Sequence, residues 1–226
     1  MKKLIVVIVI LIAAIAAGWY VFSTKGSNTN TEARSVAQAG DIVARVNGEA
    51  ILSVDLEIIK AQLAAIQGVD IATAQADVKE RLQTTALDTR IGQVLIQQEV
   101  TASGFVAPAK DVEERLAEIR SQFDTEEAFT AALAADGLTV DSLRTQVAND
   151  LAIQLYLEET LGITDVEVTD EEVRTSYAEA AAQAENVPAF EDVQDQIKAF
   201  ILQQKQQGLL DDFVQKLRAN AEIQVL

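Results

Sequence analysis

Residues 41–52 carry the sequence DIVARVNGEAIL, and this stretch decides how the fold is expected to begin. Apolar residues flank Asn47-Gly48 on both sides. This dipeptide favours the type I′ turn of a two-residue β-hairpin, because both central residues of that turn need a positive φ. The stretch therefore predicts an N-terminal β-hairpin.

A second short strand is expected at the other end of the sequence. The last residues are AEIQVL, in which Ile223 and Val225 alternate with polar residues. Segments this short are not stable alone in water. We therefore expect Ile223–Val225 to pair with the opening strand around Ile42–Val46 and to close one domain over residues 41–226.

Most of the sequence between these strands is typical of helices, with two Pro and ten Gly in the whole chain. Ser53 is an expected N-cap, and Pro108 suits a first helical turn. Asp124-x-x-Glu127 and Thr169-x-x-Glu172 match the capping box. Together with the apolar periodicity, these signals predict a mainly α fold with helices near residues 53–67, 73–102, 108–123, 124–137, 139–161, 169–184 and 190–219.

The first 26 residues form a separate segment. Lys2 and Lys3 precede the uncharged apolar run Leu4–Phe22. At about 1.5 Å per residue, this run is roughly as long as the bilayer hydrocarbon core is thick. The lysines favour a cytoplasmic N-terminus, so we expect a signal-anchor through Leu4–Phe22 in the cytoplasmic or inner membrane. The alternative is a signal peptide that is cleaved near Ala14-Ile15-Ala16.

Residues 27–40 are rich in small and polar side chains and predict a flexible linker. Through it, the domain at residues 41–226 would be tethered on the extracytoplasmic side, in the periplasm or on the cell-wall side. Because the chain beyond the anchor is strongly acidic, anionic lipid headgroups should repel the domain.

The net charge of −17, from 18 Lys and Arg against 35 Asp and Glu, restricts the partners of the chain. Nucleic acids are bound through clustered Lys and Arg, which an acidic chain does not offer. The chain has no His and no Cys, which excludes disulfides, Cys/His zinc sites and Ser-His-Asp triads. No nucleotide-binding motif is present. We therefore expect no nucleic-acid partner, no nucleotide, no cofactor and no metal.

Acidic clusters are the remaining candidates for general acid–base chemistry or metal binding. Each lies near the start of an expected helix, where carboxylates accept from unpaired N–H groups and oppose the positive end of the helix dipole. We therefore expect these residues to have capping roles and the chain to have no catalytic residues. The clusters are Glu113-Glu114, Glu126-Glu127, Asp170-Glu171-Glu172 and Glu191-Asp192.

The hairpin sequence VARVNGEAI resembles the opening of the SurA N-terminal domain family, which includes SurA-, PrsA- and PpiD-like chaperones of the cell envelope. The resemblance continues in family order through VTDEEVRTSY to the final AEIQV. It implies a SurA-like helical chaperone core with an N-terminal β-hairpin and a C-terminal strand, preceded by one transmembrane helix. The similar segments lie within residues 43–51, 91–99, 119–138, 143–158, 168–177 and 188–225.

One departure from the family bears on activity. Many members carry a parvulin prolyl-isomerase domain of about 90–100 residues between the two segments that resemble VTDEEV and FEDV. Here only residues 178–189 separate Tyr177 from Phe190, and a domain does not fit in that space. The parvulin site also typically uses histidines, which this chain lacks. The resemblance therefore implies a chaperone core without isomerase activity.

The implied function is that of a membrane-anchored, ATP-independent holdase for unfolded or nascent exported polypeptides. A holdase needs exposed apolar surface, and the candidate client-binding residues are Phe123, Phe129, Leu133 and Leu138 in the expected helical hairpin near residues 120–140. The alternative is that these four residues only pack the hairpin onto its neighbours. Two other functions stay open: a membrane-tethered scaffold for one specific envelope partner, and a residual isomerase.

Overall fold

The computed structural model describes residues 40–135, 137–183 and 187–226. The expected anchor Leu4–Phe22 and nearly all of the linker lie outside the described residues, so both stay predictions. In the described part of the chain, no helix is long and apolar enough to cross a membrane.

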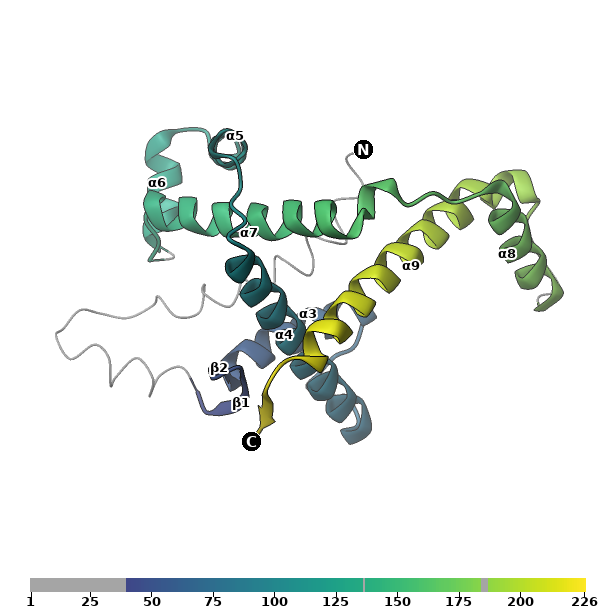
Figure 1. Ribbon diagram of the computed structural model, residues 1–226, viewed down its shortest axis with the longest axis horizontal. Helices are drawn as coiled ribbons and strands as arrows, with labels where there is room; N and C mark the ends of the chain where they lie inside the picture. The colour runs from purple at the N-terminus through teal and green to yellow at the C-terminus, as the bar shows by residue number, and fades with distance from the viewer. Residues whose placement is uncertain (1–39, 136, 184–186) are drawn as a thin grey trace. The chain divides into compact units, whose positions relative to one another are not determined.

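The described chain is mainly helical with short strands near its two ends, as the sequence predicted (Figure 1). It divides into two compact units. Unit 1 holds the described residues up to Leu155 together with Leu217–Leu226, and unit 2 is Tyr156–Lys216. The elements in chain order are β1 (Ile42–Val46), β2 (Glu49–Leu52), α3 (Ser53–Gln67), α4 (Ala76–Ser103), α5 (Ala109–Arg120), α6 (Glu126–Ala135), α7 (Val140–Leu161), η2 (Ile163–Asp165), α8 (Asp170–Gln183), α9 (Phe190–Ala219) and β3 (Ile223–Val225).

The three strands of unit 1 form one sheet in the order β2-β1-β3 (Figure 1). Asn47 and Gly48 join β1 to β2 with φ values of 50° and 88°, both positive as a type I′ turn requires. β3 runs antiparallel to β1, with Ile223 opposite Val46 and Val225 opposite Ala44. This register confirms the predicted pairing of the tail strand with the opening strand.

Asn47 also links the hairpin to the residues before β3 through hydrogen bonds. Its backbone N–H donates to the carbonyl oxygen of Glu222 at 2.8 Å, and its Oδ1 accepts from the backbone N–H of Glu222 at 2.9 Å. Its Nδ2 donates to Oε1 of Gln98 on α4 at 2.8 Å. Gln98 in turn donates from Nε2 to the carbonyl oxygen of Val46 at 3.1 Å. The turn is thus held by β3 and α4 as well as by its own conformation.

The main core of unit 1 joins the sheet to α3 and α4. Burying one large aliphatic side chain contributes about 1.5–3 kcal/mol, so this cluster is the principal source of stability in the unit. Leu217, Ala221 and Ile223 pack against its edge, which makes the last residues of the sequence part of the core. The buried members are Ala44, Val46, Ile51, Leu56, Ile59, Ala86, Ile91, Val94 and Leu95.

The start of α3 differs from the prediction. Ser53 was expected to cap the helix, but it is the first helical residue and the N-cap is Leu52. The carboxylate of Asp55 instead accepts from the backbone N–H of Leu52 at 3.4 Å. Asp55 also pairs with Arg90 of α4, with 3.5 Å between Oδ2 and Nε, so one carboxylate serves the helix end and the α3–α4 contact.

Two other helix starts were predicted incorrectly. α4 begins at Ala76, not near residue 73, because Asp70 holds the preceding residues in a turn: its Oδ1 accepts from the backbone N–H of Ala72 at 2.9 Å. α6 is not capped by Asp124. Thr125 takes that place, and its Oγ1 accepts from the backbone N–H of Ala128 at 3.1 Å.

The capping box at α8 is confirmed. The backbone N–H of Thr169 donates to Oε2 of Glu172 at 2.9 Å, and the N–H of Glu172 donates to Oγ1 of Thr169 at 3.2 Å. Glu113 and Glu114 do not lie in the first turn of α5, which begins at Ala109. They form surface ion pairs instead: Glu113 with Arg144 at 3.2 Å, and Glu114 with Lys110 at 3.4 Å.

A second core cluster in unit 1 lies between α5 and α7. Val112 and Leu116 of α5 are buried against Val147 of α7. Leu143 and Leu151 pack against this cluster from the same side of α7, as their spacing of four residues from Val147 requires. The cluster therefore packs together α5 and α7, the two helices that flank α6.

In unit 2, η2, α8 and α9 are joined by polar contacts from α9. Nζ of Lys205 lies 2.6 Å from Oε1 of Glu172 and donates to the carbonyl oxygen of Glu167 at 2.9 Å. Near the start of α9, the ring of Phe190 packs edge-to-face on Tyr177 with 5.3 Å between centroids. Figure 1 shows α8 and the start of α9 side by side.

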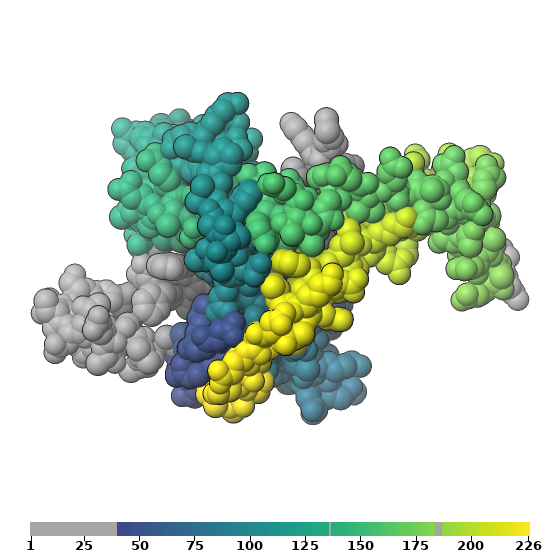
Figure 2. Space-filling model, in the orientation of Figure 1, coloured from purple at the N-terminus to yellow at the C-terminus, as the bar shows by residue number. Residues whose placement is uncertain are grey.

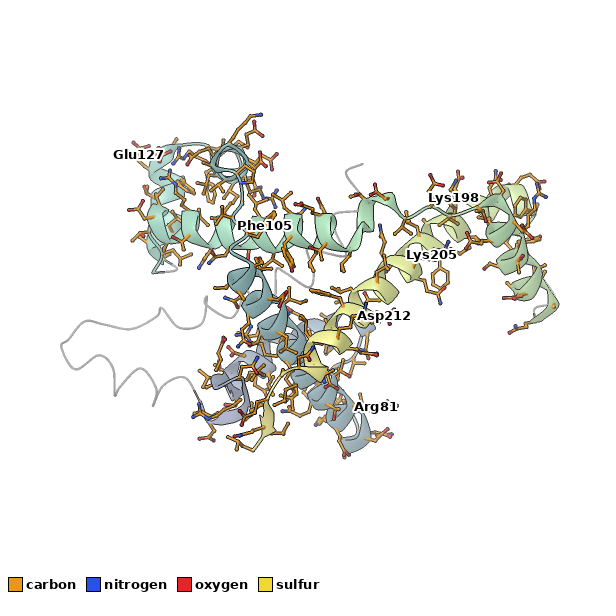
Figure 3. The ribbon with its side chains drawn as sticks, viewed as in Figure 1. Arg81, Phe105, Glu127, Lys198, Lys205 and Asp212 are labelled. Carbon is orange, nitrogen blue, oxygen red and sulfur yellow. The ribbon has the colours of Figure 1, made fainter. Side chains whose placement is uncertain are left out.

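Acid is expected to weaken the contact between α8 and α9. The hydrogen bond from Lys205, with those from Thr169, lowers the pKa of Glu172 to about 2. Because this pKa is depressed, the carboxylate stabilises unit 2 above pH of about 4.5 and loses that contribution as pH falls towards 2. Carboxyl NMR titration of Glu172 should show the low pKa, and Lys205→Met should return it towards the ordinary value. Lys198→Met, on the same helix, is the matched control (Figure 3); an equal effect of both variants would contradict this assignment.

Candidate client-binding surface

The four residues predicted to bind clients lie on α6 and on its two flanking turns, all in unit 1. Phe129 and Leu133 are four residues apart, so they share one face of α6. That face is buried: the exposed fractions are 1% for Phe129 and 9% for Leu133. Phe123 and Leu138 are half-buried. The four residues therefore fall into a covered pair and a partly accessible pair.

An aromatic and charged cluster covers Phe129. The ring of Phe123 packs edge-to-face on the ring of Phe129, with 5.5 Å between centroids and 62° between planes. The guanidinium carbon of Arg120 lies 5.2 Å from the centroid of the Phe129 ring, a cation–π arrangement. Nε of Arg120 also pairs with Glu126 at 3.2 Å. The cluster holds Phe123 at the surface with Phe129 beneath it.

The turn after α6 positions Leu138. Gly137 has a φ of 67°, which a helix-ending residue in the left-handed region adopts and which favours glycine. The backbone N–H of Leu138 then donates to the carbonyl oxygen of Leu133 at 2.8 Å. This bond folds the chain back over the end of the helix and leaves the side chain of Leu138 half-buried.

Chemically, the surface around α6 offers apolar contact. Phe123 and Leu138 supply accessible apolar area, and Phe129 and Leu133 support them from below. Among the described residues, no group of three or more acidic side chains is placed to hold a metal ion. What this surface offers a partner is therefore accessible apolar area.

The sequence analysis did not identify the most exposed apolar residues. Apart from Val225 and Leu226 at the C-terminal strand, which are 63% and 74% exposed, these are Val106 between α4 and α5, Ile66 near the end of α3, and Phe200 on α9, with exposed fractions of 78%, 64% and 62%. Ile197 and Ile201 recur at helical spacing in the sequence of α9, yet α9 has no fully buried residue in the structure. A helical pattern shows which residues share a face, but not whether another element covers that face.

Asp150 of α7 is the one described carboxyl group with a clearly raised pKa. Burial raises the pKa of Asp150 to about 6, and the nearby charge of Arg115 on α5 partly opposes the shift. A raised pKa means that the folded state binds the proton more tightly than the unfolded state. Unit 1 should therefore gain stability as pH falls from about 7 through 6.

Asp150→Asn should remove this pH dependence and stabilise unit 1 at pH 7.5, because the neutral amide avoids the burial of a charge. The measurement is urea unfolding of both proteins at pH 5.5 and pH 7.5. The difference between variant and parent should be larger at pH 7.5. Parallel behaviour of the two proteins over this range would show that Asp150 keeps an ordinary pKa.

Comparison with known proteins identifies the family to which the chain belongs. Residues 1–157 match the model of the SurA-like N-terminal domain. Since the match covers well over half of the chain, the chain belongs to the SurA-like N-terminal domain family. The match ends close to Leu155, where the first segment of unit 1 ends. Membership supports a chaperone-like role, and no parvulin domain is evident in the 226 residues of this chain.

A solved structure has a similar fold. It comes from work on PEB4 and the periplasmic protein Cj1289, two structurally related SurA-like chaperones of Campylobacter jejuni. The TM-score is 0.52 at 13% sequence identity, over 83% of this chain and 99% of that chain. At this identity the likeness shows the fold alone. No curated protein matches the sequence at a significant level.

Proposed function

We propose that the chain is a membrane-anchored, ATP-independent holdase that keeps unfolded exported polypeptides from aggregating. Membership of the SurA-like N-terminal domain family is the observation that carries this proposal. The accessible apolar side chains support it, because an unfolded chain offers apolar segments that such surfaces bind. The net charge of −17 supports it as well, because charge keeps a protein with exposed apolar area soluble.

We place client contact on the α6 surface through Phe123 and Leu138, with Phe129 and Leu133 shaping it from beneath. An unfolded segment loses conformational entropy when it is held, so each contact should be weak and reversible. Weak binding suits a holdase, which has to release its clients without ATP.

The test is suppression of aggregation of a chemically denatured client by the full chain in a nonionic detergent, with detergent alone as control. Light scattering should fall as the chain approaches the client concentration, without ATP. Loss of suppression in Phe123→Ser, with an unchanged circular dichroism spectrum, would support the α6 surface. If no client is protected and one stoichiometric partner is recovered from membranes, the chain is a scaffold instead.

The absence of isomerase activity is a separate part of the proposal. The chain has no His, and residues 178–189 leave no room for a parvulin domain. Purified chain should leave the rate of a proline-limited refolding reaction unchanged. An acceleration that a point substitution in the chain abolishes would contradict this part and leave the holdase proposal intact.

Membrane anchoring through Leu4–Phe22 is the third part. Protease added to the outside of spheroplasts should release a soluble fragment that contains the described residues. A mature protein that already begins near Ala17 would instead demonstrate signal-peptide cleavage.

A further inference from the structure

Unit 2 combines a strong negative charge with an apolar helix side that is partly exposed. Residues 156–216 contain fourteen Asp and Glu against four Lys and Arg. Two of the four basic residues already interact with other residues of the unit. Lys205 pairs with Glu172 at 2.6 Å, and the guanidinium carbon of Arg174 lies 5.1 Å from the centroid of the Phe190 ring. The negative charge of the unit is therefore poorly balanced from within.

The apolar part of the surface lies on α9. Val193, Ile197 and Phe200 follow one another at spacings of four and three residues, so they lie on one side of the helix. Val193 and Ile197 are half-buried and Phe200 is 62% exposed. Figure 2 shows the near face of α9, in yellow, over much of its length. We call Val193, Ile197 and Phe200 the α9 stripe.

Exposed carboxylates lie on the helix that carries the α9 stripe. Asp192 and Asp195 are exposed on the first turns of the helix, and Asp211 continues the side of the stripe three turns after Phe200. An apolar stripe within a negative field attracts partners that carry both apolar and positive groups, and the attraction weakens with salt.

Charge decides among the possible occupants of the stripe. Nucleic acid and anionic lipid headgroups are repelled by the acidic unit, and a second copy of this chain brings its own net charge of −17. A cationic polypeptide segment is attracted, and its apolar residues can cover Phe200. Unfolded polypeptides present such segments, because their Lys, Arg and apolar side chains are accessible together.

We propose that the α9 stripe of unit 2 binds unfolded segments in which Lys or Arg lies close to apolar residues, so that the chain selects cationic clients. This inference rests on the proposed holdase function and names the class of client. The cationic groups are attracted by the excess of carboxylates in unit 2, and the apolar residues cover Phe200.

The test uses the full chain in nonionic detergent and two unstructured peptides of equal length and identical apolar positions. One peptide carries Lys at every charged position and the other carries Glu. Fluorescence anisotropy should give at least about tenfold tighter binding of the Lys peptide at low salt, and this advantage should shrink as salt is raised. Phe200→Ser should weaken binding of the Lys peptide severalfold. Val106→Ser, which removes another exposed apolar residue in unit 1, is the matched control.

The outcomes separate this inference from the function on which it rests. Equal binding of the two peptides, tighter binding of the Glu peptide, or equal effects of Phe200→Ser and Val106→Ser would overturn the selection of cationic clients by the α9 stripe. The holdase proposal would then stand on aggregation suppression alone. If neither peptide binds and no client is protected, the proposed function fails. Circular dichroism of Phe200→Ser verifies that the variant keeps its helices.

Discussion

Replacing Phe129 by alanine is expected to lower the free energy of unfolding of unit 1 by about 3–5 kcal/mol. Phe129 is 1% exposed and is one of the largest fully buried side chains among the described residues. Its removal leaves a cavity beneath the ring of Phe123 and takes away the cation–π partner of Arg120. Urea unfolding followed by circular dichroism measures the loss.

Phe123→Ala is the informative comparison, because Phe123 lies on the same cluster but is only half-buried. It should cost clearly less stability than Phe129→Ala, and it should weaken client binding at a denaturant concentration where the protein is still folded. If Phe129→Ala proves nearly neutral, then α6 is loosely packed and Phe129 is available to clients. The two variants thus distinguish a packing role from a binding role.

The sequence predicted those parts of the fold that short-range chemistry determines. Asn47-Gly48 specified the hairpin, because few other dipeptides adopt two successive positive φ values. Thr169 and Glu172 specified the start of α8, because each side chain satisfies an N–H of the other residue. The resemblance to the SurA N-terminal domain family then supplied the order of the elements, which local signals alone do not fix.

The errors have a common cause. Ser53, Asp124 and Thr125 can all cap a helix, and the choice depends on which neighbouring oxygen reaches a free N–H. Burial on α6 and exposure on α9 depend on which helices pack together, and the sequence pattern does not contain that information. Phe129 and Phe200 both lie within helices predicted from the sequence, yet one is covered and the other is not.

Removing Ala221–Leu226 should destabilise the whole of unit 1, by at least about 3 kcal/mol, and should do more than fray an end. Ala221 and Ile223 pack against the main core, and β3 pairs with the central strand β1. The deletion uncovers that core and leaves one edge of β1 without partners. The expected result is a lower midpoint of a single cooperative transition, measured by urea unfolding.

A pair of proline substitutions tests the register that underlies this prediction. The N–H of Leu226 donates to the carbonyl oxygen of Val43 at 3.0 Å, and the N–H of Asn47 donates to that of Glu222 at 2.8 Å. Hydrogen-bonded pairs alternate in antiparallel sheets, so Gln224 exchanges bonds with Arg45, and the N–H of Val225 points away from β1.

Gln224→Pro should therefore lower the free energy of unfolding by about 1–3 kcal/mol, because it removes a donor from the ladder and leaves the carbonyl oxygen of Arg45 without its partner. Val225→Pro should be tolerated much better, because proline is accepted on edge strands where its missing N–H faces solvent. A larger loss for Val225→Pro than for Gln224→Pro would show that β3 pairs through the other set of residues. The two variants introduce the same rigid residue at neighbouring positions, so the difference between their losses measures the hydrogen bonds between β1 and β3. The test therefore shows how strongly the pairing of β3 with β1 stabilises unit 1.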